Sequence, residues 1–111
     1  HKIMAVRLAG GLSAAEEVNE ELKALACSFQ SAIEKERKVE YDAFMPLSFC
    51  TQVVAGTNYF VKVSTLICGG TRPNVNTILL LKLYKPLPHT GESTQLVGIK
   101  EIGSDDAIHT F

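Results

Sequence analysis

Three cysteines and three histidines are the residues of this chain most suited to nucleophilic or metal chemistry. Cys50 or Cys68 together with His89 would make a thiol–imidazole pair, in which the imidazole activates the thiol. Each of these cysteines stands in an apolar, strand-like stretch, where a cysteine is more often a small core residue. The sequence therefore favours structural cysteines over a catalytic pair.

Metal and phosphate sites have equally little support. The histidines, His1, His89 and His109, are scattered along the chain without an H-x-x-x-H spacing or a Cys/His cluster. The glycine pairs at 10–11 and 69–70 resemble phosphate loops only superficially, because neither is followed by G-K-[ST]. No metal and no cofactor is expected.

Length and charge exclude further classes of function. A chain of 111 residues fits one domain, residues 1–111, with a single core. The formal net charge of -1 forces no basic patch, so no nucleic acid partner is expected. The apolar run at 78–81 is too short to cross a bilayer, so no membrane partner is expected either.

The cysteine pattern also bears on the cellular compartment. An odd number of cysteines without C-x-x-C spacing disfavours a disulfide framework, and reduced thiols are typical of a cytoplasmic protein. Lys2 and Arg7 bracket too few apolar residues for a secretory signal. A cytoplasmic location is expected, with secretion left open because the native N-terminus is uncertain.

The elements that would position a site begin with an arm. Residues 1–12 show no helical period and end in Ala-Gly-Gly-Leu, which predicts a flexible N-terminal arm. Ser13 and Glu16 have the spacing of a helix capping box. One long amphipathic helix is predicted from about Ser13 to about Arg37, on a stripe of apolar residues: Val18, Leu22, Leu25, Phe29 and Ile33.

After the helix the apolar period changes to two, which is typical of half-buried strands. Strands are predicted over 41–49, from 57 onward, over 77–85 and over 94–102, and Pro46 indicates an edge or a bulge. No βαβ alternation occurs. The expected fold is α+β: one long α-helix packed on an antiparallel β-sheet of about four to five strands.

Three segments do not fit a purely structural interpretation: the arm at 8–11, the turn at 52–56 and the loop at 86–89. Apolar residues occupy the last two although the chain must turn there. In a meandering sheet these two turns fall at the same end, and the chain enters an antiparallel helix there too. The pattern fits a protein-docking surface, and it fits three unrelated loops equally well.

The motifs in these segments resemble those of the stefins, the type 1 branch of the cystatins. Residues 52–56 match the Q-x-V-x-G loop of that family, and the arm and second loop match in the same order. The matching stretches are Ala9-Gly10-Gly11-Leu12-Ser13, Gln52-Val53-Val54-Ala55-Gly56 and Leu87-Pro88-His89. Residues 64–77 are several residues longer than the usual stefin hairpin, at the end expected to lie opposite the docking surface.

The resemblance implies a cystatin-like fold and a reversible, tight-binding inhibitor of papain-like cysteine proteases such as cathepsins, not an enzyme. The arm and the two hairpin loops would occlude the active-site cleft, with Gly10 as a bend, Gln52 fixing its loop and Leu87-Pro88 as a stiff apolar contact. The implied protease-binding residues are Leu8, Ala9, Gly10, Gly11, Gln52, Val53, Val54, Ala55, Gly56, Leu87, Pro88 and His89.

The alternative is a non-inhibitory protein-binding or domain-swapped assembly module on the same scaffold. Val53 and Val54 are β-branched residues at a tight turn, and opening that hairpin would allow exchange of the helix and first strand between chains. The inhibitor is expected to act as a monomer, and the alternative is a domain-swapped dimer.

Overall fold

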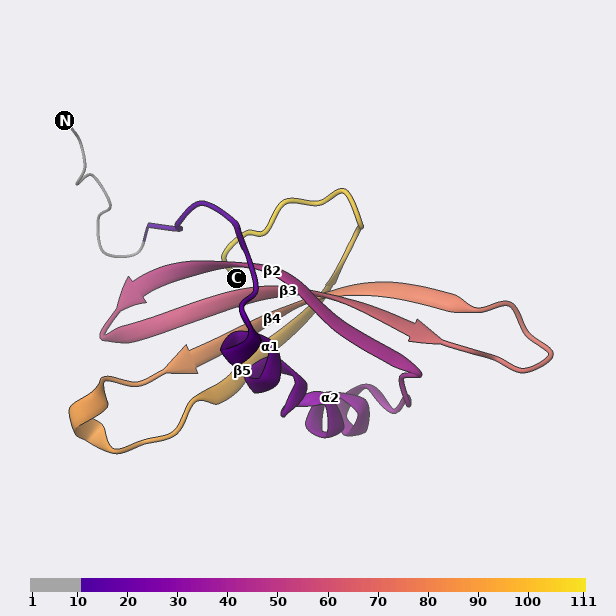
Figure 1. Ribbon diagram of the computed structural model, residues 1–111, viewed down its shortest axis with the longest axis horizontal. Coiled ribbons are helices and arrows are strands. Elements are labelled where there is room, and N and C mark those ends of the chain that lie inside the picture. Colours follow the sequence, from indigo (N-terminus) through magenta and orange to yellow (C-terminus); the bar gives the residue numbers. More distant parts are fainter. Residues whose placement is uncertain (1–10) are drawn as a thin grey trace.

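The computed structural model describes residues 11–111, so most of the predicted arm, residues 1–10, lies outside the described part. Five strands and two short helices make up the fold (Figure 1). In chain order they are β1 (Glu16–Glu17), α1 (Glu20–Cys27), α2 (Gln30–Arg37), β2 (Ala43–Val54), β3 (Gly56–Ile67), β4 (Val75–Lys85), the 3₁₀ turn η1 (Pro88–Thr90) and β5 (Gln95–Ile102).

The five strands form one antiparallel sheet in the order β1-β2-β3-β4-β5. Each long strand pairs with the next one along the chain, so β2 to β5 make a meander. The helices pack on one face of this sheet (Figure 1). The predicted fold class, α+β with a helix on an antiparallel sheet, is confirmed.

The core lies between the helices and the sheet. Successive side chains of a strand point to opposite faces, so alternate residues of β3 and β4 meet the helices. The predicted apolar stripe of the helix faces them, and all five of its residues pack in or against this core. The buried members are Leu22, Ala26, Ile33, Tyr41, Val61, Val63, Leu79, Leu81 and Leu83.

The second face of the sheet is covered by the C-terminal segment, residues 103–111. The ring of Phe111 lies 5.8 Å from the ring of buried Phe60. Lys62 and Lys82 donate hydrogen bonds from their Nζ atoms to backbone carbonyls of this segment, at 2.8 to 2.9 Å. The middle of the sheet is therefore covered on both faces, by helices on one and by an extended chain on the other.

The predicted start of the helix at Ser13 is wrong. The helix begins at Glu20, and its N-cap is Asn19, whose Oδ1 accepts a hydrogen bond from the backbone N–H of Leu22 at 2.8 Å. Residues 12–18, called the edge segment below, run along the exposed edge of β2 instead. Pairing with that edge satisfies strand N–H and C=O groups that a capping box at Ser13 would leave open.

The helix is also interrupted once, between α1 and α2. Ser28 and Phe29 keep right-handed helical dihedrals, but the N–H of Phe29 bonds back to Ala26 in a tighter turn before α2 resumes. The apolar spacing continues through the interruption, so both helices keep the same face on the sheet. Among the described residues, no helix is long and apolar enough to cross a bilayer.

The capping role of Asn19 gives a first test. Asn19→Ala is expected to lower the free energy of unfolding by about 1 kcal/mol, because it leaves a helix N–H without its acceptor. Thermal unfolding should show a midpoint lower by roughly 4 °C. Asn74→Ala, in the exposed β3–β4 turn, removes the same side chain away from any helix end and should leave the midpoint unchanged. Equal midpoints for the two variants would contradict the assignment of the cap.

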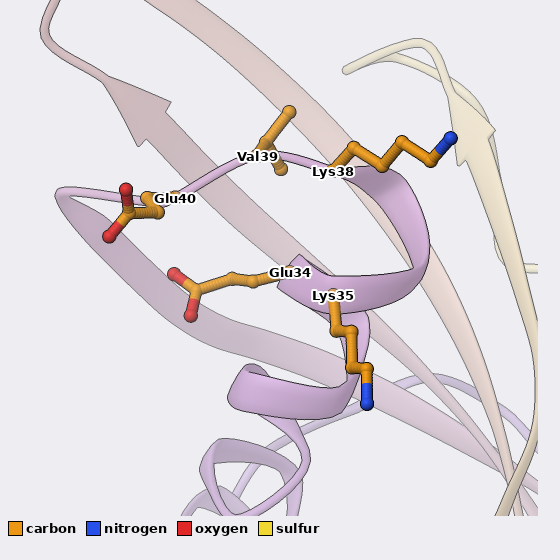
Figure 2. A pocket seen from close by; sticks show the side chains of 5 residues that line it. All are labelled: Glu34, Lys35, Lys38, Val39 and Glu40. Carbon is orange, nitrogen blue, oxygen red and sulfur yellow. The ribbon is translucent and has the colours of Figure 1, made fainter.

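The chain passes from α2 into β2 through a turn held by Glu34. Its Oε2 accepts a hydrogen bond from the backbone N–H of Tyr41 at 2.7 Å, and Lys38 adopts a left-handed conformation with φ +59°. Figure 2 shows a shallow hollow at this turn, in which Lys35 and Lys38 point away from the two carboxylates. Its lining is mostly charged and open to solvent, so we interpret the hollow as part of the turn between α2 and β2.

The strands follow the predicted pattern with longer bounds. Pro46 marks a register shift between β2 and β3, which confirms the predicted bulge. β3 extends to Ile67 and β4 starts at Val75, so much of the long stretch 64–77 belongs to the strands. The turn between them lies at the end of the sheet opposite the β2–β3 turn (Figure 1).

Candidate functional site

The β2–β3 turn projects from one end of the sheet. Val54 and Gly56 are paired, so the two strands are joined through Ala55 alone. Val53 is 45% exposed and Val54 39% exposed, although both are apolar. Residues 53–56, called the tip below, therefore present hydrophobic side chains to water at the end of two long strands.

Gly56 is required by the fold itself. Its φ is +115°, a region that side chains other than glycine rarely adopt. A Cβ at this position would lie 2.6 Å from the carbonyl oxygen of Lys85 and 2.9 Å from Cε1 of Tyr84. Gly56 thus lets the backbone of the tip approach the end of β4 closely.

Gln52 lies behind the tip and is bonded across the hairpin. Its Oε1 accepts a hydrogen bond from Nδ2 of Asn58 at 2.9 Å, and these residues face each other in the β2–β3 register. Asn58 is only 8% exposed, so this amide pair is largely protected from water. This hydrogen bond agrees with the expectation that Gln52 fixes the loop.

The edge segment brings the N-terminal part of the chain to the tip. Leu12 bridges Gln52, and Ser13 exchanges two hydrogen bonds with Thr51, each 2.8 Å long. In one of them the Ser13 N–H donates to the Thr51 carbonyl, and in the other the Ser13 hydroxyl accepts from the Thr51 N–H. Leu12, which the sequence assigned to a flexible arm, is thus paired, and half-buried Gly11 stands directly before it.

The loop between β4 and β5 lies beside the tip, because Lys85 at the end of β4 pairs with Thr57 at the start of β3 (Figure 1). Leu87 is 39% exposed, and Pro88 begins the short turn η1. The carbonyl of Leu87 accepts a hydrogen bond from the N–H of Thr90 at 3.1 Å and another from its hydroxyl at 2.8 Å. This second loop is therefore a closed, stiff structure, with His89 exposed on it.

The structure thus brings most of the sequence-predicted site residues to one end of the sheet. Gly11 enters along β2, the tip projects from β2 and β3, and the second loop follows β4. Leu8, Ala9 and Gly10 lie outside the described residues. The residues gathered are Gly11, Gln52, Val53, Val54, Ala55, Gly56, Leu87, Pro88 and His89.

The possible thiol–imidazole pairs have no support in the geometry. Cys68 follows β3 at the end of the sheet opposite the second loop that carries His89. Cys50 is 4% exposed, and burial raises the pKa of its thiol, with the carboxylate of Glu16 as a second cause. A raised pKa keeps the thiol protonated, which is the reverse of what a nucleophile needs.

Other ligand sites are absent or unspecific in the part of the chain that is described. No group of three or more metal-ligating side chains occurs among residues 11–111. A hollow of about 670 Å³ lies between α1 and the sheet, over Leu22, Leu25, Phe49 and Tyr59. A smaller one of about 360 Å³ lies between the edge segment and the C-terminal segment. Neither contains a nucleophile paired with a base.

Three residues at this end are not among the sequence-predicted site residues: Ser13, Asn58 and Tyr84. Asn58 could have been found from the hairpin itself, because a turn centred on Ala55 places it opposite Gln52. Tyr84 is on the same face as Asn58, and its hydroxyl donates a hydrogen bond to the carbonyl of Ala55. No local pattern indicates that bond, since the two residues are far apart in the sequence.

Comparison with known proteins gives the family. No family model matches the chain. It is 31% identical to leukocyte cysteine proteinase inhibitor 1 of Sus scrofa over 105 residues, 94% of each chain. It is 31% identical to cystatin-A of Homo sapiens over 92% of this chain and 97% of the relative, and 30% identical to cystatin-B of Oplegnathus fasciatus over 84% and 85%. With its helix, its five-stranded antiparallel sheet and these relatives, the chain belongs to the type 1 cystatins, the stefins.

Proposed function

We propose that the chain inhibits papain-like cysteine proteases of the cathepsin type by reversible, tight occlusion of their active-site cleft. Its membership of the type 1 cystatins makes it a cysteine protease inhibitor and not an enzyme, in agreement with relatives named cystatin and cysteine proteinase inhibitor. The details of the cleft, the contacts and the reversibility are our inference.

One observation carries this proposal: exposed apolar residues from two loops stand together at the end where the edge segment arrives. Val53, Val54 and Leu87 are each at least 39% exposed there. Burying an exposed aliphatic side chain of this size contributes on the order of 1.5–3 kcal/mol to binding. Together the tip and the second loop form an apolar wedge that suits a narrow cleft.

Rigidity is the second property that supports inhibition. The tip is held by its hairpin, by the Gln52–Asn58 amide pair and by the bond from Tyr84. Leu87 is held by the closed turn that follows it. A surface that is already in its binding shape loses little conformational entropy on docking, so more of the contact energy appears as affinity.

The arm completes the proposed mechanism. Leu8 and Ala9 would occupy substrate subsites of the protease, and Gly10 would let the backbone turn away from the catalytic thiolate. No peptide bond is then placed for attack, and no covalent step occurs. Inhibition follows from occupation of the cleft and is reversed by dissociation.

We place this activity in the cytoplasm, with the monomer as the active form. Cys27, Cys50 and Cys68 are all free thiols, which suits a reducing compartment. The monomer is the form in which the tip exists, because exchange of α1, α2 and β2 between chains would straighten residues 53–56.

The alternative, a non-inhibitory or domain-swapped module, is favoured by a single feature. β2 and β3 have twelve residues each and are joined through one residue, so opening the turn would give one continuous strand. A swapped dimer is expected not to inhibit. Separation by size-exclusion chromatography, followed by assay of each fraction, distinguishes the two forms.

Titration of papain and of a cathepsin-like protease with the purified monomer tests the proposal. Activity should fall linearly to zero near one equivalent, because one wedge fills one cleft. Intact inhibitor should be recovered when the complex dissociates, since no bond is cut. A monomer that leaves papain active, or that is consumed as a substrate, would overturn the proposed function.

A further inference from the structure

We infer that Tyr84 is a positioning residue for the tip, acting through its phenol hydroxyl on the carbonyl of Ala55. The inference rests on the proposed function, and it assigns to that function a residue outside the three stefin-like motifs. Tyr84 is the second-last residue of β4, next to the tip but not part of it.

The register of the sheet puts Tyr84 in the right place. Asn58 pairs with Gln52 on one side and with Tyr84 on the other, so these three side chains form a row on the outer face of β2, β3 and β4. Core residues such as Leu83 occupy the alternate positions and face the helices. The row therefore stands directly behind the tip, on the face away from α1.

Gly56 provides the space that Tyr84 needs. The ring passes so close to Gly56 that an added Cβ would lie 2.9 Å from Cε1 and 3.0 Å from the hydroxyl. Because glycine has no side chain, the phenol can cross β3 at this point and reach Ala55. The absence of a side chain at Gly56 thus leaves the space that the ring of Tyr84 occupies.

The Tyr84 hydroxyl bonds to the carbonyl of Ala55, which lies outside the hydrogen-bonded strands. Ala55 lies between the paired residues Val54 and Gly56 and belongs to neither strand. The Tyr84 hydroxyl donates to its carbonyl oxygen. The bond directs this oxygen toward β4. The exposed apolar groups of the tip are Val53 and Val54.

A loose tip would bind less well for a simple reason. If only a fraction of the free molecules has the binding shape, the apparent dissociation constant rises by the inverse of that fraction. Removal of one such hydrogen bond shifts a local equilibrium about three- to tenfold. The hydroxyl of Tyr84 is expected to act at this level while leaving the fold intact.

Tyr84→Phe tests this inference, with Tyr59→Phe as the matched control. Tyr59 is on β3, on the helix-covered face, and loses the same hydroxyl. Hydrogen exchange should be about three- to tenfold faster at the amides of Ala55 and Gly56 in Tyr84→Phe, and the inhibition constant for papain should rise by at most the same factor. Thermal midpoints of both variants should stay near that of the unchanged chain.

The two readouts separate failure of the inference from failure of the proposed function. Unchanged tip exchange in Tyr84→Phe would overturn the positioning role, whatever happens to inhibition. Faster tip exchange with an unchanged inhibition constant would show that the bond does not serve binding, and would equally overturn the inference. If the unchanged chain fails to inhibit papain, the proposed function falls, and the exchange data still decide whether Tyr84 holds the tip.

Discussion

Gly56→Ala is expected to weaken the inhibition of papain by about a hundredfold. A φ of +115° costs a residue with a side chain roughly 1–3 kcal/mol, and each 1.4 kcal/mol is tenfold in affinity. The added Cβ would also stand 2.6 Å from the carbonyl oxygen of Lys85, which is backbone and cannot turn aside. The hairpin can relieve the backbone strain and the contact with Lys85 only if the tip moves. Inhibition constants from papain progress curves measure the weakening.

Gly70→Ala is the matched control for this prediction. Gly70 also has a positive φ, +64°, but nothing lies within 4 Å of its added Cβ, and it is in the β3–β4 turn at the far end of the sheet. This variant should lose about 1 kcal/mol of stability and keep its inhibition constant. If Gly56→Ala and Gly70→Ala inhibit alike, the shape of the tip does not determine binding.

The sheet and the packing face of the helix could be predicted because they follow from periodicity. Alternation of apolar residues placed Tyr59, Val61 and Val63 on one face of β3. The spacing of the apolar residues in the helix placed those residues on one helical face, which packs against this side of the sheet. Pro46 indicated the bulge because a proline has no N–H for the ladder. In each case a local property of the residue agrees with its tertiary environment.

The start of the helix could not be predicted, because two local signals compete and a distant strand decides between them. Ser13 and Asn19 are both good N-cap residues. The edge of β2 offers unpaired backbone groups to residues 12–18, and Ser13 uses its hydroxyl on Thr51 instead of on a helix. β1 was missed for the same reason, since Glu16–Glu17 reads locally as the first turn of a helix.

The candidate site was proposed from its motifs, and physical patterns in the sequence indicated only part of its geometry. Exposed apolar residues at the tip and in the second loop were visible in the sequence, and the meander put them together. The supporting contacts of Tyr84 were not, because a hydrogen bond between Tyr84 and Ala55 depends on the register of three strands. Gly56 shows the difference most clearly: the motif identifies it, and only the structure supplies the contact with Lys85 and Tyr84.

Deletion of residues 1–10 is expected to speed release of papain by about ten- to a hundredfold, with little change in the association rate. When part of an interface is removed, the complex is weakened mainly through a faster dissociation rate. The cut ends before the first bridge of the edge segment, Leu12 to Gln52, so the paired part of the chain is kept. Thermal unfolding should therefore be unchanged, and stopped-flow displacement kinetics would measure the release rate.

A second truncation separates the arm from its attachment. Deletion of residues 1–13 also removes the Leu12 bridge and both hydrogen bonds between Ser13 and Thr51. Because Thr51 precedes Gln52 in β2, this longer deletion is expected to loosen the base of the tip and to speed release further. The arm contributes through its own interactions with the protease if the shorter deletion already gives most of the effect. If release becomes fast only after the longer deletion, the edge segment holds the tip in place and residues 1–10 add nothing to binding.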